Sequence, residues 1–249
     1  MALIGGIGAA VSGGGKPKAA APTSASTTVD LASQQAAAEA SASAAAASAE
    51  AASSAEAASS AAAAASSAAA AARAKPLTFS GSSDDVVKFP TPITDARILT
   101  ATAAGDGNFV IKTLDASGHE ADLLVNTIGA YRGSVLLLPQ DAISALQITA
   151  NGPWTMKVQD VTTGTQWTGT SRVAGRGDTV LIIPGGTSAV ETVKITNSGE
   201  GNFVVYATDS DRNLLVNEIG TWSGTEVLAT NTVVIEVLSD GSWSITPTS

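Results

Sequence analysis

The chain has no cysteine and one histidine, His119, among its 249 residues. It therefore cannot form a disulfide framework or a thiolate metal site, and a site built from several histidines is excluded by count. A Ser/His/Asp catalytic site would have to use His119, which lies in a polar Ser-Gly-His-Glu turn. We therefore expect no catalytic residue, no metal and no cofactor, and a protein that is not an enzyme.

Positive charge is also scarce. The sequence has 13 Lys and Arg against 22 Asp and Glu, which gives a formal net charge of −9. The basic and acidic residues of positions 1–76 balance, so the whole net charge lies in residues 77–249. Nucleic-acid binding requires Lys and Arg to neutralise phosphates, so we do not expect a nucleic-acid partner.

No long apolar run is present. The apolar stretch at the start, Met1 to Val11, is far shorter than the roughly 20 residues that span a bilayer. This length leads us to expect no membrane span. The stretch also has no basic segment before it, so it is a poor secretory signal. Residues 1–26 are predicted to be an apolar and glycine-rich docking peptide and linker, with an unstructured tail as the alternative. The side chains expected to be buried in a partner assembly are Leu3, Ile4, Ile7 and Val11.

What the chain has in abundance is alanine. Of the 39 residues from Ala36 to Ala74, 26 are alanine, the strongest helix former. Asp30 suits the positive end of a helix, and Pro76 would stop it. The composition predicts a helical segment within residues 27–75, with the helix running from about Thr28 to Ala74. A disordered low-complexity linker is the alternative interpretation.

Such a helix has almost no large apolar side chain, so we expect it to be exposed alone or bundled with copies of itself. A heptad seam that would bring parallel helices together can be drawn. Its a positions are Ala37, Ala44, Ala51, Ala58, Ala65 and Ala72. We therefore predict an oligomeric coiled-coil stalk, most simply a homotrimer.

After Pro76 the sequence contains the same segment twice. Gly107-Asn108-Phe109 returns as Gly201-Asn202-Phe203, 94 residues later. The Leu-Leu-Val-Asn segment that ends at Asn126 returns 91 residues later and ends at Asn217. Gly152 and Trp154 return 89 residues later as Gly241 and Trp243. The repeat predicts two tandem modules, residues 76–162 and 163–249.

Each module consists of about eight short runs with β-type composition, separated by turn residues. Runs of this spacing predict a mainly β fold, with two tandem β-sandwich modules of jelly-roll-like type after the long Ala-rich helix. The runs in the first module are Leu77–Ser80, Val86–Phe89, Ala96–Ala103, Asn108–Leu114, Ala121–Val125, Ser134–Leu138, Ala145–Thr149 and Trp154–Asp160. Those in the second are Thr165–Thr170, Thr179–Ile183, Val190–Thr196, Asn202–Thr208, Asn213–Val216, Thr225–Ala229, Thr232–Val237 and Trp243–Thr246.

Most of the aromatic residues fit a structural role. Trp154 and Trp243 begin strands with one apolar face, and Phe109 and Phe203 follow Gly-Asn turns, so all four are predicted to be in the core. Tyr131 and Trp222 are flanked by glycines and are expected in loops. These two aromatics either plug their own module or contact a ligand or partner. The candidate contact residues are Tyr131, Trp222, Asn126 and Asn217.

Two resemblances follow from these segments. The alternation of Ala runs with Ser and occasional Glu, from Ala36 to Ala72, resembles the stalks of phage side tail fibres. This resemblance implies a trimeric coiled coil that carries β-rich tips. The Gly-Asn-Phe, Leu-Leu-Val-Asn, Ile-Gly and Gly-Pro-Trp pattern is similar to small β modules of exported actinobacterial proteins and their phages. That likeness implies no activity that can be assigned to these positions.

Together these features predict a non-enzymatic structural virion protein of a tailed phage: a fibre, whisker or decoration subunit. The N-terminus would dock to other virion proteins, and the modules would stabilise the particle or contact a host-surface glycan. Assembly would take place in the host cytoplasm. The alternative is a bacterial cell-surface or secreted carbohydrate-binding protein with a flexible Ala/Ser linker.

Overall fold

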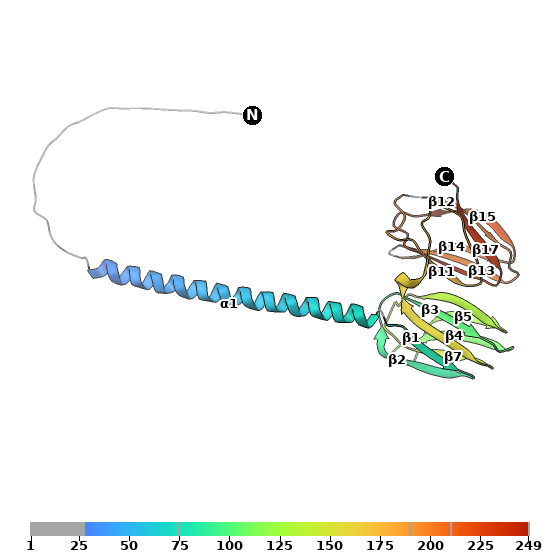
Figure 1. The fold of residues 1–249 in the computed structure, drawn as a ribbon, viewed down its shortest axis with the longest axis horizontal. Coiled ribbons are helices and arrows are strands. Elements are labelled where there is room, and N and C mark those ends of the chain that lie inside the picture. The colour runs from blue at the N-terminus through green and yellow to red at the C-terminus, as the bar shows by residue number, and fades with distance from the viewer. Residues whose placement is uncertain (1–27, 74, 190, 210, 249) are drawn as a thin grey trace, which may run out of the picture. The chain divides into compact units, whose positions relative to one another are not determined.

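The computed structural model describes residues 28–73, 75–189, 191–209 and 211–248, and only the backbone of residues 28–32 and 69–73 at the two helix ends. These described residues are mainly β, with one α-helix and four sheets (Figure 1). The prediction of a mainly β protein with an N-terminal helix is confirmed. The docking peptide predicted from Leu3, Ile4, Ile7 and Val11 lies outside the described residues.

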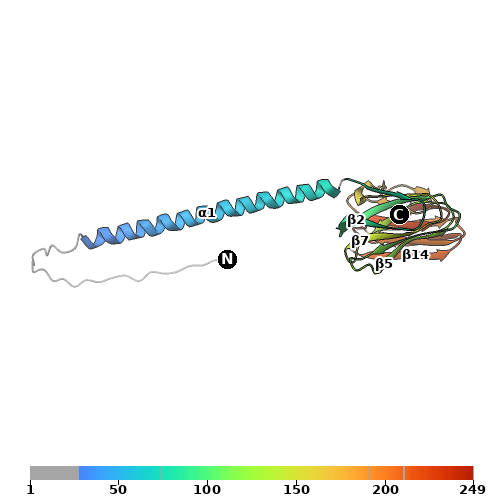
Figure 2. The same ribbon diagram turned by 90° about the horizontal axis from the view of Figure 1, so that it is seen from below.

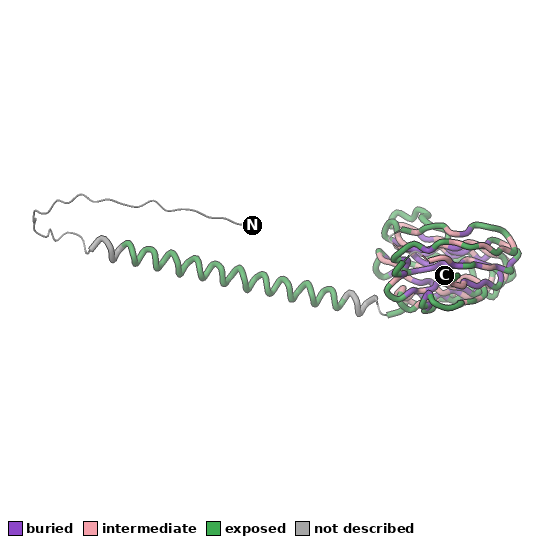
Figure 3. Tube along the Cα trace, turned by 90° about the horizontal axis from the view of Figure 1, so that it is seen from above, coloured by how far each residue is buried: buried purple, intermediate pink, exposed green. Residues whose placement is uncertain are grey.

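Helix α1 spans Thr28–Arg73, close to the range predicted from its alanine content. Every side chain from residue 33 to residue 68 is exposed, as Figure 3 shows. The Ser48 hydroxyl donates to the carbonyl oxygen of Ala44, and the Ser60 hydroxyl donates to that of Ala57. These serines satisfy their hydroxyls on their own helix. The seam alanines from Ala37 to Ala65 are therefore exposed in the single chain, and the side chain of Ala72 is outside the described set.

The first module has two four-stranded antiparallel sheets, which we call sheets A and B. Sheet A has the strand order β1-β8-β3-β6, and sheet B has the order β2-β7-β4-β5. The strands of the module are β1 (Leu77–Gly81), β2 (Asp85–Ile93), β3 (Arg97–Ala103), β4 (Asn108–Leu114), β5 (Glu120–Ile128), β6 (Tyr131–Leu137), β7 (Ile143–Thr149) and β8 (Trp154–Asp160).

The second module repeats this order in sheets that we call D and C. Sheet D has the order β10-β17-β12-β15, and sheet C has the order β14-β13-β16-β11 with the short strand β9 added in parallel to β11. A 3-10 turn at Val161–Thr163 precedes it. Its strands are β9 (Thr165–Gln166), β10 (Val173–Arg176), β11 (Thr179–Ile182), β12 (Glu191–Asn197), β13 (Asn202–Thr208), β14 (Arg212–Ile219), β15 (Trp222–Leu228), β16 (Val234–Ser239) and β17 (Ser242–Pro247). Figure 2 shows both modules from a second side.

Each module has its own core, which lies between its two sheets and gives a sandwich-like arrangement. The predicted core aromatics are confirmed, because Trp154, Trp243, Phe109 and Phe203 are between 0% and 3% exposed. A glycine lies under each indole. A Cβ on Gly81 would collide with Trp154, and one on Gly175 would collide with Trp243. The close approach of strand and indole is therefore the same in both modules.

The sequence interpretation was wrong at three places. Thr165–Thr170 does not form the first main strand of the second module; only Thr165–Gln166 is a strand, and the strand equivalent to β1 is Val173–Arg176. Trp167 follows β9 and packs in the core of the second module. This segment therefore contributes one large side chain to the core rather than a main strand. Tyr131 and Trp222 are the first residues of β6 and β15, although their glycine neighbours predicted loops.

Candidate functional site: the junction between the two modules

Among the described residues, buried acidic side chains lie at the contact between the two modules, which we call the junction. Strand β6 is an edge strand of sheet A, and it lies against β11 and β16 of sheet C. A small apolar cluster joins them: Leu136 and Val180 are each 1% exposed, and Val234 is 7% exposed. Each of these side chains points away from the core of its own module. The two modules are therefore packed together.

Tyr131 provides the first polar contact of the junction. Its hydroxyl donates to Oδ2 of Asp178 over 2.7 Å. The other carboxylate oxygen, Oδ1, accepts the backbone N–H of Ser239, and the backbone carbonyl of Asp178 accepts the N–H of Ser134. Asp178 thus connects an edge strand of one module to a turn and a strand of the other.

Gly133 allows this contact. A Cβ at this position would lie 2.8 Å from the Cβ of Asp178 and 2.5 Å from the Tyr131 hydroxyl. Any larger residue would therefore push Asp178 away from β6. Gly177, with a φ of 73°, is a second such position, because a Cβ there would lie 3.3 Å from the backbone carbonyl oxygen of Arg132.

Glu236 provides the second polar contact. Its side chain is 2% exposed, yet it accepts the N–H of Leu136 at 2.7 Å and an N–H of Arg212 at 2.6 Å. The guanidinium of Arg212 lies over the ring of Tyr206, 3.8 Å from its centroid, and also faces Asp122 of the first module at 3.9 Å. The buried carboxylate of Glu236 is therefore satisfied by one donor from the first module, Leu136, and one from the second, Arg212.

Burial changes the acidity of these groups. Removal from water raises the pKa of the Glu236 carboxyl above its ordinary value, although Arg212 and the Leu136 N–H act in the opposite direction. Burial also raises the pKa of Asp178, against the effect of the Tyr131 hydrogen bond. The pKa of Tyr131 is raised far above its usual range by burial and by the Asp178 charge, so its hydroxyl remains a donor.

The four candidate contact residues are not gathered in one place. The ring of Tyr131 packs on Phe109, with a centroid distance of 5.5 Å, and its hydroxyl is in the junction. Trp222 packs on Phe203 at 5.9 Å at the rim of the second core. Asn126 and Asn217 lie on the exposed faces of the edge strands β5 and β14. The structure therefore separates the two asparagines from the two aromatics.

Sequence reasoning missed Asp178 and Glu236. Asp178 follows Arg176-Gly177, and the segment has the composition of an ordinary turn before a strand. Its counterpart Asp84 lies 94 residues earlier, so the repeat contained a signal for a structural role. Glu236 had no such signal, because a single acidic residue in a Val-Ile-Glu-Val-Leu strand does not reveal that another module covers it.

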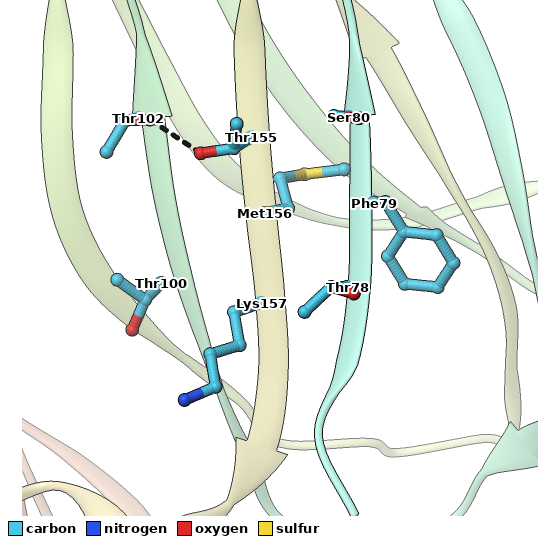
Figure 4. Close-up of a pocket in the computed structure, with 8 residues that line it drawn as sticks. All are labelled: Thr78, Phe79, Ser80, Thr100, Thr102, Thr155, Met156 and Lys157. Atoms are coloured by element: carbon cyan, nitrogen blue, oxygen red, sulfur yellow. Dashed lines mark hydrogen bonds between the residues drawn. The ribbon is translucent and has the colours of Figure 1, made fainter.

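A second feature is a shallow depression of about 320 Å³ on the outer face of sheet A. Figure 4 shows the residues that line it, which include five Ser and Thr residues, Lys157, Met156 and Phe79. The Thr102 and Thr155 hydroxyls are hydrogen-bonded to each other across strands at 2.8 Å. Thr196 and Ser244 form the equivalent pair in the second module. The polar lining residues are Thr78, Ser80, Thr100, Thr102, Thr155 and Lys157.

Within the described ranges, no group of three or more acidic, histidine or cysteine side chains could hold a metal ion. His119 is 81% exposed and faces Asp115 of its own turn at 3.4 Å. Nor does the helix in the described part of the chain have the length and apolarity needed to cross a membrane.

Comparisons with known proteins give no family for the chain. No protein-family model and no curated protein matches it. An allantoicase structure is similar to 67% of this chain and 90% of its own, at 10% identity and a TM-score of 0.24. A regulatory subunit of a cAMP-independent protein kinase A from Trypanosoma brucei covers 69% of this chain and 74% of its own, at 11% identity and a TM-score of 0.20. The stem and receptor-binding domain of spike protein P1 from bacteriophage PM2 covers 70% and 78%, at 10% identity and a TM-score of 0.15. Scores this low carry no argument about fold or function.

Proposed function

We propose that this chain is a non-enzymatic structural protein that displays two β modules on an oligomeric helical stalk. We further propose that it belongs to the virion of a tailed phage, as a fibre, whisker or decoration subunit. The observation that carries the proposal is the long helix α1, whose described side chains are all exposed in the single chain.

An isolated helix of this kind gains little stability from packing. Helical stability in proteins comes mostly from burial of an apolar face, and alanine and serine present very little area. The α1 helices of several copies of the chain can lie close together along the seam Ala37, Ala44, Ala51 and Ala58, because small side chains allow close approach. A parallel bundle therefore gives α1 the packing that the single chain lacks.

The β modules fit a display role better than a catalytic one. Their aromatic side chains fill cores, and the buried acids Asp178 and Glu236 are fully engaged in the junction. These two acids therefore hold the modules together, as a display role requires. The phage setting rests on the resemblance of the Ala/Ser tract to side tail fibre stalks, and docking through residues 1–26 remains part of the proposal.

Light scattering on the full chain tests the stalk. We expect a mass that is a multiple of the 24.6 kDa subunit, most simply three. A monomer at every concentration, with the helical signal of α1 absent from its circular dichroism spectrum, would remove the basis of the proposal. Immunogold labelling of particles made from the encoding genome, with antibodies against the β modules, would test the virion setting separately.

The depression on sheet A supports one alternative, a carbohydrate-binding protein with an Ala/Ser linker. Its hydroxyls and Lys157 could hydrogen-bond a polyhydroxylated ligand, while Phe79, the aromatic residue that lines it, packs against Phe89 and the core of the first module. A glycan array with the full chain tests it. Binding that is lost in Lys157→Ala and Thr155→Val but kept in the control Lys194→Ala, on the second module, would favour the alternative.

A further inference from the structure

The junction uses two different surfaces, and the repeat provides each of them a second time. The β6 surface consists of Tyr131, Gly133, Ser134 and Leu136. The surface that receives it, which we call the Asp178 surface, consists of Asp178, Val180 and Glu236. Since each module is built on the same strand order, each has both surfaces. Only one of each is used in the junction.

In the second module, the counterpart of the β6 surface is on β15. The offset of 91 residues places Trp222, Gly224, Thr225 and Val227 at the positions of Tyr131, Gly133, Ser134 and Leu136. The strand pairing agrees, because Tyr131 faces Ala103 while Trp222 faces Asn197, 94 residues further on. Both β6 and β15 are edge strands of their sheets. We call this set the β15 surface.

In the first module, the counterpart of the Asp178 surface consists of Asp84, Val86 and Gln147. Oδ1 of Asp84 accepts the N–H of Ala150 at 2.9 Å, as Oδ1 of Asp178 accepts that of Ser239. Val86 pairs with Gln147 across strands, as Val180 pairs with Glu236. We call this set the Asp84 surface.

The exposed fraction of the apolar side chain at the centre of each surface shows which surfaces are covered. Leu136 and Val180 are each 1% exposed in the junction. Their counterparts Val227 and Val86 are 52% and 47% exposed. They belong to a small number of large apolar side chains that are exposed in the described residues, and they lie at the two positions that the junction buries. The apolar contact of the junction is therefore present in an uncovered form at both ends of the tandem.

The polar groups are also compatible. An edge strand offers outward N–H groups, and the N–H groups of Ser134 and Leu136 are used in this way in the junction. Thr225 and Val227 occupy the same edge positions on β15. Gln147 replaces Glu236 as the acceptor. The basic Arg212 has no basic counterpart either: the offset of 91 places Ala121 at its position, and the strand pairing places Glu120 there. A neutral amide oxygen accepts an N–H without burial of a charge.

We propose that the β15 surface of one chain docks on the Asp84 surface of a second copy of the chain, in a repetition of the junction. The contact is heterologous, because two different surfaces meet, so it generates a ring if it closes and a filament if it does not. It is independent of the stalk. A stalk would strengthen it, since linked modules are held at a high effective concentration.

Cross-linking tests the contact in the full chain, which contains no native cysteine. The double variant Val86→Cys/Val227→Cys is treated with a short bismaleimide linker and run on a denaturing gel. We expect covalent dimers and larger species. Each single variant should remain monomeric on the gel, because a heterologous contact does not bring two copies of the same residue together.

The matched control is Val86→Cys/Leu214→Cys. Leu214 is 53% exposed, about the same as Val227 at 52%, and its counterpart Leu123 remains 50% exposed in the presence of the existing junction. We expect about tenfold less cross-linked product from the control, because only Val227 is held at the contact. Equal yields in the two double variants, or no product from Val86→Cys/Val227→Cys, would overturn the inference.

The outcome is distinguishable from failure of the stalk. A trimeric mass without specific cross-links rejects the second contact and leaves the stalk intact. Specific cross-links in a chain that is monomeric when dilute reject the stalk and support the contact. A second measure uses the double variant Val86→Cys/Thr225→Cys, which should also give cross-linked product. Addition of Val227→Asp to this chain should abolish the product, since a buried unpaired charge opposes docking.

Discussion

Tyr131 of the first module donates its hydroxyl to Asp178 of the second over 2.7 Å, and the contact is closed by a glycine that leaves no room for a side chain. The same tyrosine packs its ring on Phe109 in the core of its own module. One side chain therefore connects a hydrophobic core to a buried acid of the neighbouring module. This arrangement couples the stability of the junction to that of the first module.

Tyr131→Phe should weaken the junction. The ring would still pack on Phe109, but Asp178 would lose one of its donors while it remained buried. We expect a loss of about 1–3 kcal/mol in the free energy of unfolding, measured by urea titration. Tyr206→Phe is the control, because it removes the chain's other tyrosine hydroxyl and keeps the ring beneath Arg212. Equal losses in the two variants would argue against a special role for the Tyr131–Asp178 bond.

Arg212→Ala should be more damaging. It leaves the Glu236 carboxylate, 2% exposed, without its counter-charge. Removal of one partner of a buried pair typically costs about 3–5 kcal/mol. Lys112→Ala is the matched variant, because it breaks the exposed Lys112–Glu120 pair, and such surface pairs contribute about 0–1 kcal/mol. A small effect of Arg212→Ala would mean that Glu236 is neutral in the folded variant, and the stability of the variant would then fall more steeply with rising pH than that of the native chain.

The stability of the β modules should fall as the pH rises from acidic to neutral values. Burial raises the pKa of Asp178 and of Glu236, so the folded chain retains protons that the unfolded chain releases. The free energy of unfolding therefore decreases with pH from about 4, the ordinary carboxyl value, through the raised values, and then becomes constant.

Urea titrations at a series of pH values measure this slope. Asp178→Asn should reduce it, since the amide keeps an oxygen for the Ser239 N–H and cannot ionise. The control Glu120→Gln changes an exposed carboxyl and should leave the slope unchanged. A stability that rises with pH in the native chain would contradict the assignment of these two acids.

The sequence predicted the helix, the strand-rich modules and the core aromatics because each depends on local composition. Alanine favours a helix at every position, and Trp154 and Trp243 stand in strands with an alternating apolar face. The repeat predicted two modules, because equivalent residues return at a nearly constant offset. The first strand of the second module was misplaced, because Thr165–Thr170 has β-type composition while Val173–Arg176 contains a glycine that lies under Trp243.

The junction could not be predicted in the same way. Its residues come from strands that are distant in the sequence, and a single module contains no indication of what covers Leu136 or Glu236. The glycines that flank Tyr131 predicted a loop, yet Gly133 is needed for close approach to Asp178 rather than for a turn. Comparison of the two modules position by position is what distinguishes covered from uncovered surfaces.

The stalk seam makes a prediction that separates a bundle from a free helix. Ala51→Asp together with Ala58→Asp places charges on two a positions of the seam, where neighbouring helices would bury them. Light scattering should then show a monomer, and the helical signal should be lower than that of the native chain because the helix has lost its packing. Ala42→Asp together with Ala49→Asp is the control: it replaces the same residue type at the same spacing, at f positions opposite the seam. Since both variants exchange two alanines for aspartates, they lose the same helix propensity, and a bundle loses its mass only in the seam variant. If both variants lower the mass equally, or neither does, helix α1 is not a coiled coil with this seam.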